Sequence, residues 1–129
     1  MGKGATMALV NMNEAGFEKA IEQKGIVLVD FWAAWCGPCR AFGPIFEKAS
    51  EKYPEITFAK VDTEAEQNLA AGAGISSIPT LMVFKDGILL FNQAGALPES
   101  SLDELIVAAV ALDMDSVRAE IAAQTKASE

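Results

Sequence analysis

The stretch Ile26-Val-Leu-Val-Asp-Phe-Trp32, followed after three residues by Cys36-Gly-Pro-Cys39, decides the fold. The first segment is an almost unbroken apolar run, which is typical of a strand buried on both faces of a sheet. The second segment opens a helix that we expect to continue to about Lys52, because apolar residues recur at helical spacing along it. These residues are Phe42, Ile45, Phe46 and Ala49. The sequence thus predicts a buried strand that leads directly into a helix carrying two cysteines in its first turn.

Apolar spacing and turn signals place the other elements on both sides of this unit. Strands are expected at residues 8–10, 56–62, 80–85 and 88–93, and helices at residues 13–25, 63–74 and 98–110. Thr63 and Glu66 have the spacing of a capping box at a helix start, and Asp86-Gly87 is a two-residue hairpin signal. Strands that alternate with helices in this order predict an α/β fold, with one mixed sheet flanked by helices on both faces.

The two ends of the chain lie outside this pattern. Residues 1–7 are expected to form a flexible leader, and residues 8–112 the folded domain. Residues 113–129 form a C-terminal extension, for which two alternatives remain open. Asp115 caps a short additional helix that carries Val117 and Ile121 on one face, or the segment is a frayed tail.

The charge and hydropathy of the chain exclude two classes of partner. Ten Lys and Arg oppose 18 Asp and Glu among 129 residues, so the net charge is −8. No basic stripe is present to neutralise phosphates, and we therefore expect no binding to nucleic acid. No apolar run approaches the roughly 18 residues that a membrane span needs. A cytoplasmic protein without membrane attachment is the expectation.

Two cysteines and no histidine narrow the possible chemistry. A closed zinc site takes four Cys or His ligands, so this chain cannot build one, and no metal is expected. A single cysteine pair is also too little for the disulfide framework of a small secreted domain. Cysteines this close together in an intracellular chain are more plausibly reactive than structural.

The position of Cys36 favours a reactive thiolate. At the start of a helix, unpaired backbone N–H groups and the positive end of the helix dipole stabilise the ionised sulfur. Cys39 lies one turn further along the same face, within reach of a disulfide with Cys36, and Pro38 stiffens the short ring between them. The alternative is a pair of ordinary buried thiols, which this strand–loop–helix setting disfavours.

Asp30 is a charged residue type within a strand that is expected to be buried on both faces. A buried carboxyl without partners has a raised pKa, because burial penalises its charged form. Without histidine in the chain, Asp30 is the leading candidate for the general base that takes the proton of Cys39. The alternative is that Asp30 points to the strand end and to water.

Three segments together resemble the thioredoxin family: Val29-Asp-Phe-Trp-Ala33, Trp35-Cys-Gly-Pro-Cys39 and Ile78-Pro-Thr80. The resemblance runs from about Val10 to Val110 and implies a five-stranded sheet with four flanking helices. It also implies a general protein-disulfide reductase that acts as a monomer on disulfide-containing proteins and binds no cofactor. A separate NADPH-dependent thioredoxin reductase would recycle it. Extensions like residues 113–129 are similar to those of some actinobacterial members.

The resemblance also implies further site residues. Lys60 would be the charged neighbour of Asp30, although its residue type alone indicates a surface lysine. Pro79 would follow a cis peptide bond and face the disulfide, whereas an ordinary trans strand start is the simpler interpretation. A shallow apolar docking surface for substrate would be bordered by Trp35, Gly37, Pro38, Ile78 and Gly95. Trp32 would support the site from the core.

Other functions compete with disulfide reduction. Oxidases and isomerases of the wider superfamily usually carry histidine between their cysteines, where this chain has Gly37-Pro38. A binding module would use the same apolar surface without turnover. An iron–sulfur cluster bridged between two chains would use both thiolates as ligands.

Overall fold

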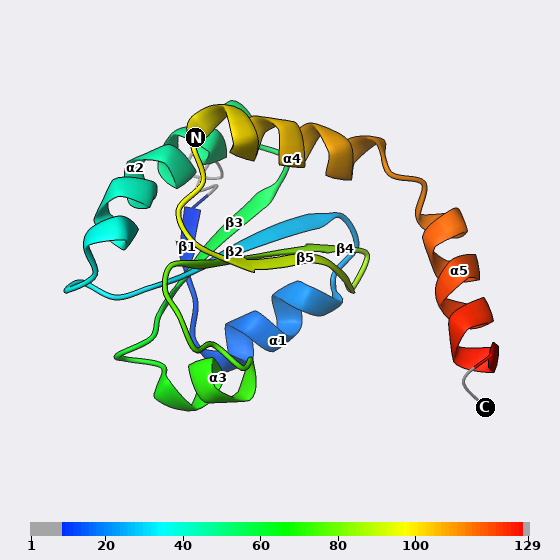
Figure 1. The fold of residues 1–129 in the computed structure, drawn as a ribbon, viewed down its shortest axis with the longest axis horizontal. Helices are drawn as coiled ribbons and strands as arrows, with labels where there is room; N and C mark the ends of the chain where they lie inside the picture. The colour runs from blue at the N-terminus through cyan, green and yellow to red at the C-terminus, as the bar shows by residue number, and fades with distance from the viewer. Residues whose placement is uncertain (1–8, 128–129) are drawn as a thin grey trace, which may run out of the picture.

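A five-stranded mixed sheet with helices on both faces forms the body of the molecule in the computed structural model (Figure 1). The structure describes residues 9–127, so the expected leader at residues 1–7 lies outside the described residues. The strands are β1 (Leu9–Asn11), β2 (Ile26–Trp32), β3 (Thr57–Asp62), β4 (Thr80–Lys85) and β5 (Ile88–Ala94). The helices are α1 (Glu14–Glu22), α2 (Gly37–Lys52), α3 (Gln67–Gly72), α4 (Glu99–Ala111) and α5 (Met114–Ala127).

The strand order β1-β3-β2-β4-β5 puts β2 at the centre of the sheet. Strands β1, β3 and β2 run parallel, whereas β4 is antiparallel to both β2 and β5. The hairpin expected at Asp86-Gly87 is present, with Lys85 paired to Ile88. Both turn residues have positive φ, 52° at Asp86 and 81° at Gly87, as a tight hairpin turn requires. The predicted α/β fold with a mixed sheet is confirmed.

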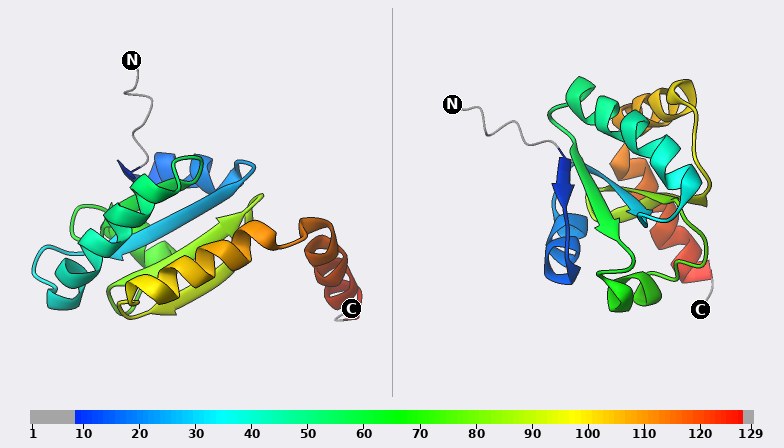
Figure 2. Two further views of the ribbon diagram at one scale, coloured as in Figure 1. Left: turned by 90° about the horizontal axis from the view of Figure 1, so that it is seen from above. Right: turned by 90° about the vertical axis from the view of Figure 1, so that its left-hand side faces the viewer.

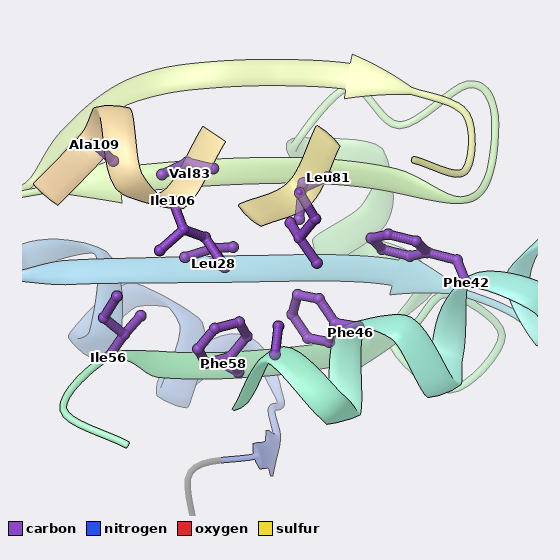
Figure 3. Packing of buried hydrophobic residues seen from close by; sticks show 11 residues of the cluster. Leu28, Phe42, Phe46, Ile56, Phe58, Leu81, Val83, Ile106 and Ala109 are labelled. Atoms are coloured by element: carbon purple, nitrogen blue, oxygen red, sulfur yellow. The ribbon is translucent and has the colours of Figure 1, made fainter. Parts of the chain in front are cut away.

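Each face of the sheet has its own apolar core. Helices α2 and α4 lie side by side on one face, and α1 and α3 cover the other (Figures 1 and 2). Under α2 and α4, aromatic rings from α2 pack on the sheet and on side chains of α4 (Figure 3). The fully buried members of this cluster include Leu28, Phe42, Phe46, Phe58, Leu81, Val83, Leu102 and Ile106.

Alternation along β2 determines which side chains face α2. Val27, Val29 and Phe31 belong to the core under α1 and α3, whereas Leu28 belongs to the core under α2 and α4. Successive strand residues point to opposite faces, so Asp30 faces α2 together with Leu28. The strand therefore delivers one carboxyl group to the apolar layer beneath the helix that carries the cysteines.

The prediction of a helix start at Thr63 was wrong. Helix α3 begins at Gln67, and Glu66 caps it without a side-chain hydrogen bond. The Asp62 carboxylate accepts the N–H of Glu64 at 2.9 Å instead, and the Thr63 hydroxyl donates to the Trp32 carbonyl at 3.0 Å. The Thr63 hydroxyl thus binds the end of β2, and the Asp62 carboxylate holds the turn that follows β3. The capping box of Thr63 and Glu66 therefore does not form.

A fifth helix stands where four flanking helices were expected. Helix α5 projects from the end of the sheet opposite to the start of α2 (Figure 1). The residue that caps it is Asp113, which accepts from the N–H of Asp115 and the hydroxyl of Ser116; the prediction of Asp115 as the cap was wrong. The helical alternative for the extension holds, while the boundary of the domain at residue 112 stays a prediction.

Charged contacts hold the junction between α4 and α5. The Lys85 ammonium at the end of β4 donates to the carbonyl oxygens of Ala109, Val110 and Leu112 at 2.7, 3.1 and 2.9 Å. Arg118 lies 3.7 Å from the Asp86 carboxylate. Val110, in the last turn of α4, is 53% exposed. Among residues 9–127, no helix is long and apolar enough to cross a membrane.

Candidate active site

The two cysteines form a disulfide at the start of α2. Cys36 is the N-cap residue of the helix, and its Cα lies 5.2 Å from the Cα of Cys39. The backbone N–H of Cys39 points at the Cys36 sulfur, with 3.2 Å between N and Sγ. Both cysteines are buried against Ala33, Trp32 and Ile78. After reduction, this N–H and the helix N-terminus would stabilise a thiolate on Cys36.

Asp30 is fully buried, so the alternative that it points to water at the strand end is wrong. Neither of its carboxyl oxygens has a hydrogen-bond partner among the described residues. Burial raises the pKa of Asp30 from 3.8 to about 7, and the positive charge of Lys60 partly opposes this rise. The carboxyl group can therefore accept and release a proton near neutral pH.

Lys60 is the register partner of Asp30 across β2 and β3, so both side chains emerge on the same face. The Lys60 ammonium lies 4.8 Å from the centre of the Trp32 ring, an arrangement typical of a cation–π contact. It also approaches α2 closely, since a Cβ added to Gly43 would lie 3.8 Å from it. Lys60 and Trp32 line a hollow of about 520 Å³. Lys60 is thus a half-buried neighbour of the site, unlike an ordinary surface lysine.

The loop before β4 lies against the disulfide. The peptide bond between Ile78 and Pro79 is cis, as the family resemblance implied. The Ile78 carbonyl oxygen lies 3.7 Å from the Cys36 sulfur, and Gly95 donates its N–H to the Pro79 carbonyl at 2.8 Å. Pro79 and two of the expected docking residues, Ile78 and Gly95, are thereby brought to one side of the disulfide.

A groove of about 170 Å³ runs beside the disulfide. Trp35, which is 67% exposed, forms one wall, and its indole N–H donates to the Glu64 carboxylate at 3.3 Å. Gly37 and Pro38 are exposed in the first turn of α2. The residues that line the groove are Trp35, Thr63, Ala70, Ile75, Ser76, Ser77 and Ile78.

Comparison with known proteins agrees with this geometry. The family model described as Thioredoxin matches residues 8–108. This chain belongs to the thioredoxin family. A Streptomyces coelicolor protein named "Putative thioredoxin 2" is 50% identical over 115 residues, which are 89% of this chain and 86% of that protein. The thioredoxin of Bacillus subtilis is 38% identical over 101 residues, 78% of this chain and 96% of its own length. As a thioredoxin, the chain is a thiol–disulfide oxidoreductase.

Solved thioredoxin structures share the fold. A thioredoxin variant from Halobacterium salinarum superposes with a TM-score of 0.74 at 30% identity, over 81% of this chain and 93% of that one. The thioredoxin of Malassezia sympodialis gives a TM-score of 0.70 at 33% identity, over 77% of this chain and 90% of its own. The expected thioredoxin fold is confirmed.

Sequence reasoning missed one wall of the thioredoxin groove. Thr63 was interpreted only as a helix cap, and Glu64, Ser76 and Ser77 were not singled out. A signal was present, since the carboxyl ends of the parallel strands β2 and β3 must meet at one edge of the sheet. The residues that follow β3 could therefore be expected to lie beside the loop that follows β2.

Proposed function

We propose that this thioredoxin is a general protein-disulfide reductase in which Cys36 attacks the target and Cys39 resolves the intermediate. The observation that carries this assignment is the disulfide at the N-terminus of α2 beside the open groove. Of the two sulfurs, that of Cys36 receives the backbone N–H and lies next to the Ile78 carbonyl. Cys39 sits one turn further into the helix, which suits an internal thiol.

The reaction has two exchange steps. First, the Cys36 thiolate attacks one sulfur of the target disulfide, the target S–S bond breaks, and the leaving sulfur takes a proton from solvent. Second, Cys39 gives its proton to the Asp30 carboxylate and attacks the Cys36 sulfur. The mixed disulfide breaks, and the second target sulfur leaves as a thiolate that is protonated in turn. The target gains two electrons, and the Cys36–Cys39 disulfide is restored.

Asp30 and Lys60 would tune the second step. A pKa of about 7 lets Asp30 take a proton from Cys39 and return it to solvent within one cycle. Lys60, which lies opposite Asp30 on the neighbouring strand, would stabilise the Asp30 carboxylate that must be present before the proton of Cys39 is transferred. Both are assigned here as catalytic residues behind the disulfide.

Substrate would dock on the surface around the groove. Trp35 and Ile78 line it, and the exposed first turn of α2 continues it on the other side of the disulfide. We assign substrate binding to Trp35, Gly37, Pro38, Ile78, Pro79 and Gly95. An extended segment of a target protein would lie along this surface, with its disulfide above Cys36.

Continued turnover needs an external reductant. An NADPH-dependent flavoprotein, thioredoxin reductase, would return two electrons to the Cys36–Cys39 disulfide, so the chain itself would need no bound cofactor. We place the protein in the cytoplasm as a monomer, with residues 8–112 as the sufficient domain. Membership of the family supports each of these assignments.

Insulin reduction tests the assignment. With dithiothreitol or NADPH and a thioredoxin reductase as reductant, the chain should accelerate precipitation of the insulin B chain. Cys36→Ser should abolish this turnover. Reduced Cys39→Ser, freed of dithiothreitol before it meets insulin, should instead accumulate a covalent mixed disulfide, because attack proceeds and no second thiol resolves it. Normal turnover by Cys39→Ser would contradict the assigned roles.

The reduction potential of the cysteine pair separates the competing functions. A strongly reducing potential is expected, because a reductase must pass electrons to its targets. An oxidising potential would instead assign the chain to oxidation or isomerisation. An inert disulfide would favour a binding module, and a visible absorption spectrum would reveal an iron–sulfur cluster.

A further inference from the structure

The charges around the groove are unevenly distributed. The side chains that line it carry no ionisable group. The β3–α3 connection, which contributes Thr63 to the groove, also carries Glu64 and Glu66, and Asp62 ends β3 directly before it. The nearest cation in sequence to the disulfide is Arg40, which donates to the Ala34 carbonyl at 3.4 Å. Asp62 and Glu66 line the separate hollow that contains Lys60, whereas Glu64 contacts a wall of the groove, where the proposed chemistry requires no negative charge.

Glu64 is the carboxylate that the structure fixes at the groove. Its carboxylate accepts the indole N–H of Trp35, the exposed wall of the groove. Its backbone N–H is held by Asp62 at 2.9 Å. The preceding residue, Thr63, donates both its backbone N–H and its hydroxyl to the Trp32 carbonyl, at 2.9 and 3.0 Å. The loop is therefore tied to the end of β2, and the position of the charge is set by the fold.

The Glu64 carboxylate retains capacity for another partner. An ionised carboxylate has about four acceptor sites, of which the Trp35 indole uses one. Glu64 is exposed, whereas Asp62 and Glu66 are half-buried, and Asp62 already accepts backbone N–H groups. A cation on a docked substrate would therefore meet Glu64 first.

We propose that Glu64 is a specificity-determining residue that favours target disulfides flanked by lysine or arginine. This inference rests on the proposed reductase function and adds to it the charge class of the preferred substrate. Glu64 takes no part in the exchange of sulfur bonds. It acts on docking, through its charge beside Trp35.

The expected preference is modest, because the contact is open to solvent. Exposed ion pairs change an equilibrium by about 1.5- to 5-fold, and salt weakens them. The chain should therefore reduce a cationic substrate roughly two- to fivefold more efficiently than an otherwise identical neutral one at low ionic strength. The advantage should shrink at roughly 0.5 M salt, where the screening length is only a few ångströms.

The test uses three synthetic peptides, each with one intramolecular disulfide, which differ at a flanking position that holds Lys, Gln or Glu. The value of kcat/KM is measured for the wild type and for Glu64→Gln, which keeps an acceptor for the Trp35 indole but removes the charge. Glu120→Gln, an identical change on the exposed face of α5, is the matched control. The expected order in the wild type and the control is Lys, Gln, Glu, from fastest to slowest. Glu64→Gln should reduce all three peptides at the rate of the neutral one.

The outcomes separate this inference from the reductase assignment. If Glu64→Gln keeps the wild-type order, or if the wild type shows none, Glu64 does not determine specificity although the reductase function stands. If Glu64→Gln slows all three peptides equally, Glu64 only positions Trp35 and the charge preference is refuted. If the wild type reduces none of the peptides and no insulin, the reductase function itself fails.

Discussion

Replacing Asp30 by asparagine removes the one carboxyl group that β2 carries into the core. Asp30 is fully buried without a hydrogen-bond partner, so its charged form is the costly one. In the unfolded chain this carboxyl ionises near 3.8, and in the folded protein near 7. Between these values the unfolded state releases a proton that the folded state keeps, so the stability of the wild type falls as pH rises.

The size of the effect follows from the two pKa values. Each pH unit across the interval is worth about 1.4 kcal/mol, so a rise from 3.8 to about 7 corresponds to about 4 kcal/mol. Asp30 is protonated in both states below pH 3.8 and ionised in both states above about pH 7. Its contribution to the free energy of unfolding is therefore constant outside this interval. The asparagine that replaces it does not titrate. The stability of Asp30→Asn minus that of the wild type should therefore increase by about 4 kcal/mol between about pH 4 and pH 7.

Urea unfolding of the oxidised proteins, followed by tryptophan fluorescence at half-unit steps from about pH 4 to pH 8, measures this difference. The oxidised form is used because a disulfide does not titrate. Glu120→Gln, which replaces an exposed carboxyl group on α5 by an amide, is the matched control. A constant difference for Asp30→Asn would refute both the burial of Asp30 and its role as general base. Slower resolution of mixed disulfides by Asp30→Asn is the matching kinetic result.

Two further predictions concern Lys60 and the C-terminal extension. Lys60→Met should raise the pKa of Asp30 above its wild-type value, because the positive charge of Lys60 opposes the effect of burial. NMR of the Asp30 carboxyl carbon measures this pKa. The control variant Lys52→Met, at the far end of α2, should leave the pKa of Asp30 unchanged. Removing residues 113–129 should leave insulin reduction within about threefold of the full chain, because α5 lies away from the disulfide. The same truncation should lower Tm by roughly 5–10 °C, because it removes the buried Met114 and the contact of Arg118 with Asp86. A large loss of activity at unchanged Tm would assign the extension to function.

Most of the fold could be predicted because its signals are local. The apolar run of β2, the Asp86-Gly87 turn and the spacing of Phe42 and Phe46 each determine one element from neighbouring residues alone. The errors arose where distant groups compete for the same atoms. The Thr63 hydroxyl donates to the carbonyl oxygen of Trp32 and therefore does not cap a helix.

The placement of the main candidate site residues could also be predicted in part from the sequence. Cys36 could be placed at a helix start from the strand before it, and Asp30 stood out because it is polar within an apolar run. The position of Lys60 depended on strand register, which residue type does not reveal, so only the family resemblance indicated it. Glu64 was missed because its contact with Trp35 joins two loops 29 residues apart.

The ammonium group of Lys85 has a practical consequence for chemical labelling. All three of its N–H donors are engaged by the carbonyl oxygens that end α4, those of Ala109, Val110 and Leu112. Acylation of this nitrogen would leave one N–H, so two of these three hydrogen bonds would be lost. Amine-directed dyes and surface-coupling reagents should therefore attach first to lysines that lie free on the surface. Immobilisation through amines would then leave the junction of α4 and α5 intact.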